Sequence, residues 1–159
     1  MVTISLCMIV KNEERVLGRC LESVQEIADE IIIVDTGSED RTKEIAEKYH
    51  ARVFEQEWQD DFSRARNYSF SHAEMDYCMW LDADDIITKS EALKLKRWKE
   101  ETDESSDVIM LRYVAGFDEK RNPTLVYYRE RIVKRDKDFR WQGMRRLLSE
   151  AGRNIWIVR

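Results

Sequence analysis

The sequence predicts an α/β fold, with a mostly parallel, doubly wound sheet, helices on both faces and a small antiparallel distal part. Up to about residue 115, apolar runs rich in β-branched residues alternate with helical periodicity, as in parallel strands joined by right-handed crossovers. Beyond that point "TLVYYRERIVKR" alternates with a period of two after the turn residues Asn122 and Pro123, which predicts antiparallel strands. No linker or repeat interrupts the chain, so residues 1–159 are predicted to form one domain.

Each strand is predicted from a short apolar or alternating run, and each helix from apolar residues three or four apart. In the first helix, Leu17, Cys20, Leu21 and Val24 share one face. The predicted strands are residues 3–10, 30–35, 51–56, 77–82, 107–114, 124–135 and 154–159. The predicted helices are residues 11–27, 40–49, 60–73 and 91–101, the last capped by Thr88 or Ser90.

Composition and charge narrow the classes of protein. Hydrophobic residues make up 43% and charged residues 37% of the chain, as in ordinary globular domains. The formal net charge of −5 argues against a general binder of nucleic acid or anionic membranes, so we expect no nucleic-acid partner. No apolar run is long enough for a transmembrane segment. Three cysteines without metal-ligand spacing suit a reducing cytoplasm, and the two that lie inside apolar runs are predicted to be buried free thiols. Peripheral attachment at the inner membrane face stays open.

Polar residues follow three of the predicted strands, where ligands bind in open parallel sheets. Residues 11–14 follow the first strand, residues 35–38 end the second, and residues 82–85 end the strand at 77–82. We expect these strand ends to meet at one edge of the sheet. Glycine-rich phosphate loops are absent from the sequence, which argues against a dinucleotide dehydrogenase or a P-loop NTPase.

Two carboxylates at the third of these strand ends suggest a metal. Asp82 and Asp84 are two apart, which in extended backbone puts both side chains on one face. Like charges repel there unless a cation joins them, and oxygen ligands suit Mg²⁺ or Mn²⁺ bridging to phosphates. The alternative is an acidic loop that caps the next helix through Asp85 or Thr88. The position after a buried strand and beside Asp35 favours the metal.

Other residues at this edge have both a structural and a ligand-binding interpretation. Asp35 stabilises the "DTGS" turn, contacts the sugar or base of a nucleotide, or does both. Asn12 and Glu13 cap the first helix or contact a ligand. Arg64 and Arg66 precede the acidic strand, and either one approaches a diphosphate or is solvated.

Four motifs carry a resemblance to a known family. "SLCMIVKNEE", "EIIIVDTGSEDRT", "FSRARNYS" and "MWLDADD" occur in the order and spacing of family-2 glycosyltransferases of the GT-A fold, which the chain resembles over residues 2–90. The motifs are similar to those of a bacterial subgroup whose members often carry tetratricopeptide repeats after the catalytic domain, and some of which modify peptides. The resemblance implies a Rossmann-like GT-A sheet and inverting transfer from a nucleotide-sugar donor, with UDP as the expected nucleotide.

The resemblance also implies roles for individual residues. Asp35 would contact the uracil, and the Asp82–Asp84 pair would bind Mn²⁺ or Mg²⁺, directly or through water. The metal would stabilise charge on the leaving UDP. The acceptor, whether a glycan, lipid, protein or peptide, is not specified. The nucleotide-binding residues expected in this way are Val10, Asn12, Glu13, Asp35, Arg66, Asp82 and Ala83.

The distal part departs from the family pattern. The family usually continues past an aromatic-x-Gly with a His-Glu pair; "FRWQG" resembles the first part, but residues 144–148 hold neither His nor Glu. Glu150 is the nearest carboxylate and our candidate for the general base that deprotonates the acceptor. The chain is also shorter than family catalytic domains usually are, as in a truncated chain or a degenerate paralogue. A catalytically impaired nucleotide-sugar-binding remnant and a nucleotidyltransferase of related fold are therefore the alternative functions.

Overall fold

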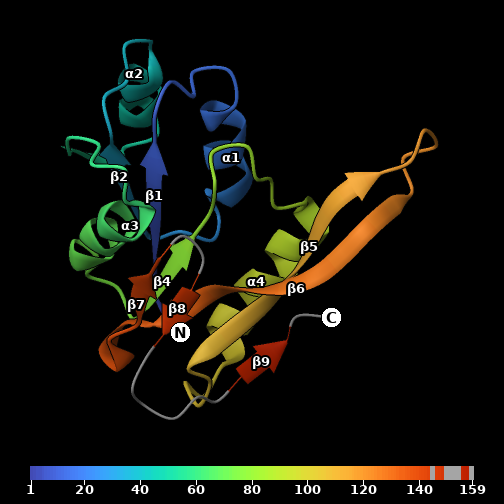
Figure 1. Cartoon of the computed structure of the whole chain (residues 1–159). Helices are drawn as coiled ribbons and strands as arrows, with labels where there is room; N and C mark the ends of the chain where they lie inside the picture. Colours follow the sequence, from blue (N-terminus) through green and yellow to red (C-terminus); the bar gives the residue numbers. More distant parts are fainter. Residues whose placement is uncertain (144–145, 149–154, 158–159) are drawn as a thin grey trace.

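The computed structural model describes residues 1–143, 146–148 and 155–157. A seven-stranded sheet of order β3-β2-β1-β4-β6-β5-β9 forms its centre, and a two-stranded sheet of β7 and β8 lies beside it (Figure 1). The strands are β1 (Ile4–Val10), β2 (Glu30–Asp35), β3 (Arg52–Glu55), β4 (Tyr77–Trp80), β5 (Val108–Phe117), β6 (Pro123–Lys134), β7 (Arg140–Gln142), β8 (Arg146–Leu148) and β9 (Ile155–Ile157). The helices are α1 (Leu17–Val24), α2 (Thr42–Lys48), α3 (Phe62–Ser71), α4 (Lys89–Glu101) and the short 3₁₀ helix η1 (Arg135–Lys137).

The sheet is mostly parallel, as predicted. Strands β1 to β4 pair in parallel, and β9 pairs in parallel with β5. Strand β6 runs antiparallel to both β4 and β5, between which it lies. The antiparallel part therefore belongs to the main sheet. The C-terminal half of β5 and the N-terminal half of β6 project from this sheet as a hairpin (Figure 1).

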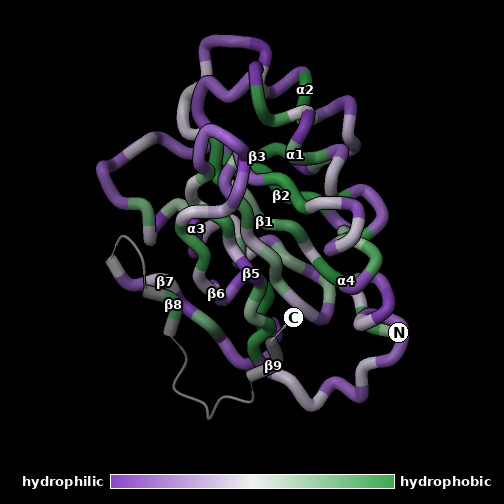
Figure 2. Tube along the Cα trace, turned by 90° about the vertical axis from the view of Figure 1, so that its right-hand side faces the viewer, coloured by the Kyte–Doolittle hydropathy of each residue, from purple (hydrophilic) through white to green (hydrophobic). Residues whose placement is uncertain are grey.

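Both faces of the sheet are covered, which explains why its strands read as continuous apolar runs. Helices α1, α2 and α4 pack on one face, where Leu17, Ala46 and Leu95 join the core around β1. On the other face, Ala73 at the end of α3 and Trp141 of β7 contact the side of β4 that carries Trp80. Figure 2 shows the hydrophobic residues gathered along β1 and β2 in the middle and hydrophilic residues on the outer loops.

The first helix is shorter than predicted and is not capped as expected. Asn12 adopts a left-handed conformation with φ of 55°, so the chain turns before the helix begins at Leu17. The Asn12 side chain accepts a hydrogen bond from the Glu39 amide (2.8 Å), and the N-cap residue Val16 makes no side-chain cap bond. The prediction that Asn12 or Glu13 caps this helix is therefore wrong.

The last helix is capped by Thr88, one of the two predicted caps, and begins at Lys89, earlier than the predicted start at residue 91. The Thr88 hydroxyl accepts a hydrogen bond from the Glu91 amide, and backbone at Thr88 is extended, as at most N-caps. The alternative cap, Asp85, has a different role: its carboxylate accepts the Asp82 amide at 2.9 Å and so faces back into its own loop.

Cys7, Cys20 and Cys78 are all free and buried, which confirms the prediction made for the two cysteines in apolar runs. Burial raises the pKa of Cys20 to about 12, so this thiol stays protonated at neutral pH. Within the described part of the chain, each helix is too short or too polar to cross a bilayer.

Candidate functional site

The carboxyl ends of β2, β1 and β4 lie next to one another, because these three strands are neighbours and parallel. Two adjoining cavities open at this edge. One, of about 560 Å³, lies beside Asp35, and the other, of about 540 Å³, lies beside Asp82 and Asp84. Lys11, Thr36 and Trp58 line both cavities, so one elongated ligand can occupy the two together. The predicted meeting of polar strand ends is thus observed.

Asp35 both shapes a turn and leaves one oxygen without a partner. The whole residue is 1% exposed, and its Oδ1 accepts hydrogen bonds from the backbone amides of Gly37 (3.0 Å) and Ser38 (2.7 Å), with Gly37 at φ of 105°. The turn interpretation is therefore confirmed. Among the described residues, no donor reaches Oδ2, which is buried. A buried carboxylate oxygen without a donor is costly, which points to a ligand N–H as its partner.

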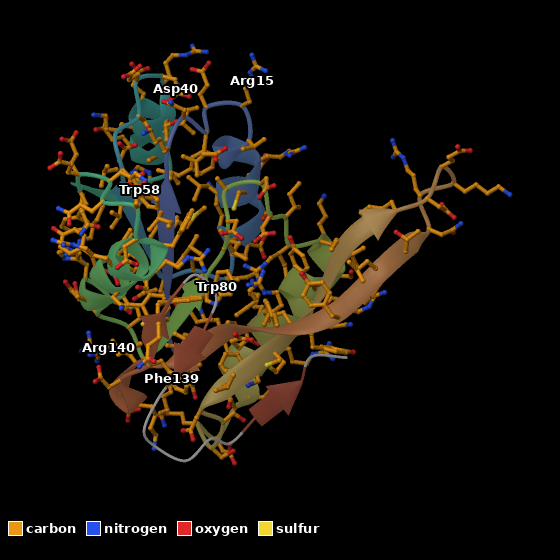
Figure 3. All side chains as sticks on the ribbon, in the orientation of Figure 1. Arg15, Asp40, Trp58, Trp80, Phe139 and Arg140 are labelled. Atoms are coloured by element: carbon orange, nitrogen blue, oxygen red, sulfur yellow. The ribbon has the colours of Figure 1, made fainter. Side chains whose placement is uncertain are left out.

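Gln56 has a second buried oxygen without a partner in the same cavity. The backbone N–H of Gln56 donates to the backbone carbonyl of Asp35 (2.9 Å), so the two residues are neighbours at the ends of β3 and β2. Its side-chain Oε1 is buried and unpaired within the described residues. Trp58 lies two residues further on and is labelled in Figure 3. Neither residue was predicted from the sequence; the signal was the polar end of the predicted strand "ARVFEQ", which was not considered as part of the site.

The acidic motif forms a tight turn and not an extended strand. Strand β4 ends at Trp80, and the Asp85 amide donates to the backbone carbonyl of Asp82 at 3.0 Å. The expectation that Asp82 and Asp84 share a face of extended backbone is therefore wrong. They nevertheless line the same cavity, because the turn brings both toward it.

Two cations compensate part of the charge on this turn. Arg66 Nη2 lies 3.0 Å from Asp82 Oδ1, and the Arg66 guanidinium contacts the rings of Trp80 (4.6 Å) and Trp141 (4.4 Å), which also pack against each other. Of the two arginines predicted to approach the ligand, Arg66 lines the cavity and Arg64 is exposed to solvent. The second cation, Arg131, lies 2.9 Å from Asp85 Oδ2.

The residues at this turn suit a divalent cation bound together with phosphate. Burial raises the pKa of Glu13, and the negative charges of Asp84, Asp40 and Asp82 raise it further, so acidic groups crowd this place. Within the described residues no cluster of three or more ligand side chains is arranged to enclose an ion. Mg²⁺ and Mn²⁺ do not need such a cage, because they bind one or two carboxylates, water and substrate phosphates. Asp84 and Asp82 fit that pattern.

Most of the predicted site residues come together here. Val10, Glu13 and Ala83 line the cavity beside the acidic turn with Arg66, Asp82 and Asp84. Asn12 lines neither of the two cavities; its amide donates to the Ser38 hydroxyl at 2.9 Å, which ties two loops together. Glu150, the candidate base, lies outside the described residues.

The fold and this site define a class of protein. The sequence model described as "Glycosyl transferase family 2" matches residues 5–150. The chain belongs to this family.

Relatives of the chain agree with this family. It is 38% identical over 143 residues to the TPR repeat-containing protein Synpcc7942_0270 of Synechococcus elongatus, a match of 89% of this chain and 34% of that protein. It is 32% identical over 97 residues to glycosyltransferase SunS of Bacillus phage SPbeta, covering 60% of this chain and 23% of SunS. The lipopolysaccharide core biosynthesis glycosyltransferase LpsC of Rhizobium meliloti is 29% identical over 130 residues, which is 79% of this chain and 44% of LpsC. The chain thus spans less than half the length of each of these relatives.

Solved structures confirm the GT-A fold. TarS 1–349 of S. aureus in complex with UDP is 25% identical, with a TM-score of 0.61 over 77% of this chain and 38% of that one. Another structure of S. aureus TarS is 20% identical, with a TM-score of 0.66 over 98% of this chain and 37% of that one. Glucosyl-3-phosphoglycerate synthase of Mycobacterium tuberculosis, in complex with UDP, has a TM-score of 0.58 at 22% identity over 72% of this chain and 45% of that chain.

Proposed function

We propose that the chain binds a UDP-sugar at the carboxyl edge of the sheet and transfers the sugar to an acceptor with inversion. The observation that carries this proposal is the pairing of two adjoining cavities with different chemistry. One contains a buried carboxylate oxygen of Asp35 and the buried side-chain amide of Gln56, for which the described residues offer no partner, and the other contains the acidic turn. A nucleotide sugar has the matching order of groups, with a hydrogen-bonding base at one end and a diphosphate at the other.

The base is proposed to bind beside β2 and β3. Uracil has one ring N–H with a carbonyl on either side. Asp35 Oδ2 would accept from that N–H, and the Gln56 amide, turned by a side-chain flip, would donate to a carbonyl. Trp58 lines both cavities and offers an aromatic surface between base and diphosphate. The UDP in a TarS structure of this fold supports the choice of nucleotide.

The diphosphate is proposed to lie at the acidic turn. Asp84 is exposed, and Asp82 is oriented by Arg66, so both can hold a cation that accompanies the diphosphate. Mn²⁺ or Mg²⁺ bound here would supply Lewis-acid stabilisation of the leaving diphosphate. A likeness in fold to a mannosyltransferase of Pyrobaculum calidifontis in complex with GDP-Man and Mn²⁺ is in keeping with this assignment.

Transfer would be a single displacement at the anomeric carbon. An acceptor oxygen attacks this carbon, the bond from carbon to the phosphate oxygen breaks, and UDP leaves with the bonding electrons. The acceptor proton passes to a general base, for which Glu150 stays the candidate. We place the reaction in the cytoplasm, because three free thiols suit a reducing compartment.

A second candidate function is a donor-binding remnant without turnover. The sequence that favours it is residues 144–148, where neither His nor Glu follows Gly143. Binding and turnover separate the two functions, because a remnant binds UDP but does not hydrolyse or transfer the sugar of a UDP-sugar.

A thermal-shift screen tests donor binding. UDP, GDP, CDP and ADP are each added with Mn²⁺, and a ligand at 100 times its Kd stabilises the native state by about 2.7 kcal/mol. We expect UDP to raise the Tm most. Equal shifts for all four nucleotides, or none, would contradict the proposed uracil pocket. Release of free sugar from a UDP-sugar panel then tells an enzyme from a remnant.

A further inference from the structure

Each of the three carboxylates in the acidic turn has a different environment. Asp82 pairs with Arg66, and Asp85 pairs with Arg131. Asp84 is exposed, and among the described residues no cation pairs with it. Two of the three charges are therefore compensated by the protein, and one is left for a ligand.

The Asp85–Arg131 pair is buried and contacts the backbone at the start of the turn. Arg131 and Asp85 side chains are 2% and 9% exposed, and Nη2 lies 2.9 Å from Oδ2 in an ion pair whose geometry does not make a hydrogen bond from Nη2. Arg131 Nη1 also donates to the backbone carbonyl of Trp80 (3.3 Å), the last residue of β4. Asp85 Oδ2 accepts the Asp82 amide at 2.9 Å. One guanidinium from β6 thus holds the residue before the turn and the residue that closes it.

Aromatic rings fix the Arg131 side chain in this position. Its guanidinium lies 4.1 Å from the centre of the Trp80 ring and 4.9 Å from that of Tyr113. The Asp85 carboxylate also lies near Tyr113: burial and this negative charge raise the pKa of the Tyr113 hydroxyl. With Arg131, Tyr113 and the Asp82 amide around it, the Asp85 carboxylate is committed to contacts within the protein.

Stability alone does not explain such a pair. Replacing a buried ion pair with apolar residues of similar volume is often neutral or stabilising, because desolvation cancels the attraction between the charges. The ion pair instead fixes the shape of the turn, because it holds the Asp85 carboxylate in place between the Trp80 carbonyl and the Asp82 amide.

We propose that Arg131 and Asp85 are positioning residues that hold the turn from Asp82 to Asp85 so that Asp84 stays free and faces the cavity. The pair itself touches no substrate. The proposal rests on the proposed function, in which Asp84 meets the cation that accompanies a diphosphate.

Paired variants test this role by calorimetry with UDP, in the presence of Mn²⁺ and of EDTA. In D85L/R131M both charges and the acceptor for the Asp82 amide are lost. We expect the UDP affinity in Mn²⁺ to fall about tenfold, the size of a lost hydrogen bond, and the affinity in EDTA to stay unchanged. In D85N/R131Q the amide oxygen at position 85 can still accept from the Asp82 amide, so we expect part of the Mn²⁺-dependent affinity to return.

A matched control comes from the far end of the sheet. Lys99 Nζ pairs with Asp29 Oδ2 at 2.6 Å and donates to the backbone carbonyl of Ile27. D29L/K99M therefore also removes a partly buried pair that holds a loop. We expect it to change the Tm but not the Mn²⁺-dependent UDP affinity, because a merely structural loss acts on stability alone.

The outcomes separate this inference from the function on which it rests. If the unaltered protein binds no UDP, the proposed function fails. If it binds UDP and D85L/R131M keeps the full Mn²⁺-dependent affinity, the positioning role is overturned. Should D85L/R131M not fold, R131K retains the charge but cannot reach Asp85 and the Trp80 carbonyl together. We expect it to weaken UDP binding in Mn²⁺ several-fold, and an unchanged affinity overturns the proposal as well.

Discussion

Replacing Asp35 with Asn should weaken UDP binding while leaving the free protein as stable as before or more so. The Asn side chain keeps Oδ1 for the amides of Gly37 and Ser38, so the turn is retained. Its NH₂ group takes the place of Oδ2, which accepts no hydrogen bond from the described residues. The free protein therefore loses a buried, partly uncompensated charge and no hydrogen bond.

The ligand meets the opposite situation. A hydrogen bond to a charged group contributes about 1.5–3 kcal/mol, and in D35N the uracil N–H would face another donor. The Kd for UDP should therefore rise about 10- to 100-fold, measured by calorimetry, while urea unfolding gives an equal or higher free energy of unfolding. A destabilised D35N variant that binds UDP as well as the unaltered protein would refute this reasoning and leave Asp35 with its turn alone.

Three further predictions follow from single side chains. D84N should lower the UDP affinity in Mn²⁺ to its value in EDTA with an unchanged Tm, because Asp84 is exposed; a large loss of Tm would instead show a structural role. E13Q should raise the Tm near neutral pH, because a raised Glu13 pKa means that ionisation of this group costs more in the folded than in the unfolded chain. That gain should disappear below about pH 4, where Glu13 is protonated in both states, and a gain of equal size at both pH values would contradict it. T88A should cost about 1 kcal/mol in urea unfolding through the lost cap of α4 and leave UDP binding unchanged; altered binding would connect this cap to the site.

The parts of the fold that depend on local pattern could be predicted from the sequence. Continuous apolar runs identified β1, β2 and β4 because both faces of the sheet are covered, and spacing of three and four identified α1. The position of β6 between β4 and β5 could not be predicted, since it depends on pairing between strands far apart in the sequence.

The site was predicted in outline for the same reason. Asp35, Asp82 and Asp84 follow buried strands, so their common edge follows from topology. The shape of the acidic turn did not follow, because the rule of period two holds only for extended backbone and the chain turns directly after Trp80. The partner of Asp85 comes from β6, and no local pattern connects it with Arg131.

Calorimetric titration of UDP into the unaltered protein, in Mn²⁺ and in EDTA, most directly tests whether these two cavities form a nucleotide-sugar site. We predict one UDP per chain, bound more tightly in Mn²⁺ than in EDTA, because Asp84 has no cation among the described residues to compensate its charge. Absence of binding under both conditions would contradict the site itself, and equal affinity in Mn²⁺ and EDTA would contradict the role of the acidic turn.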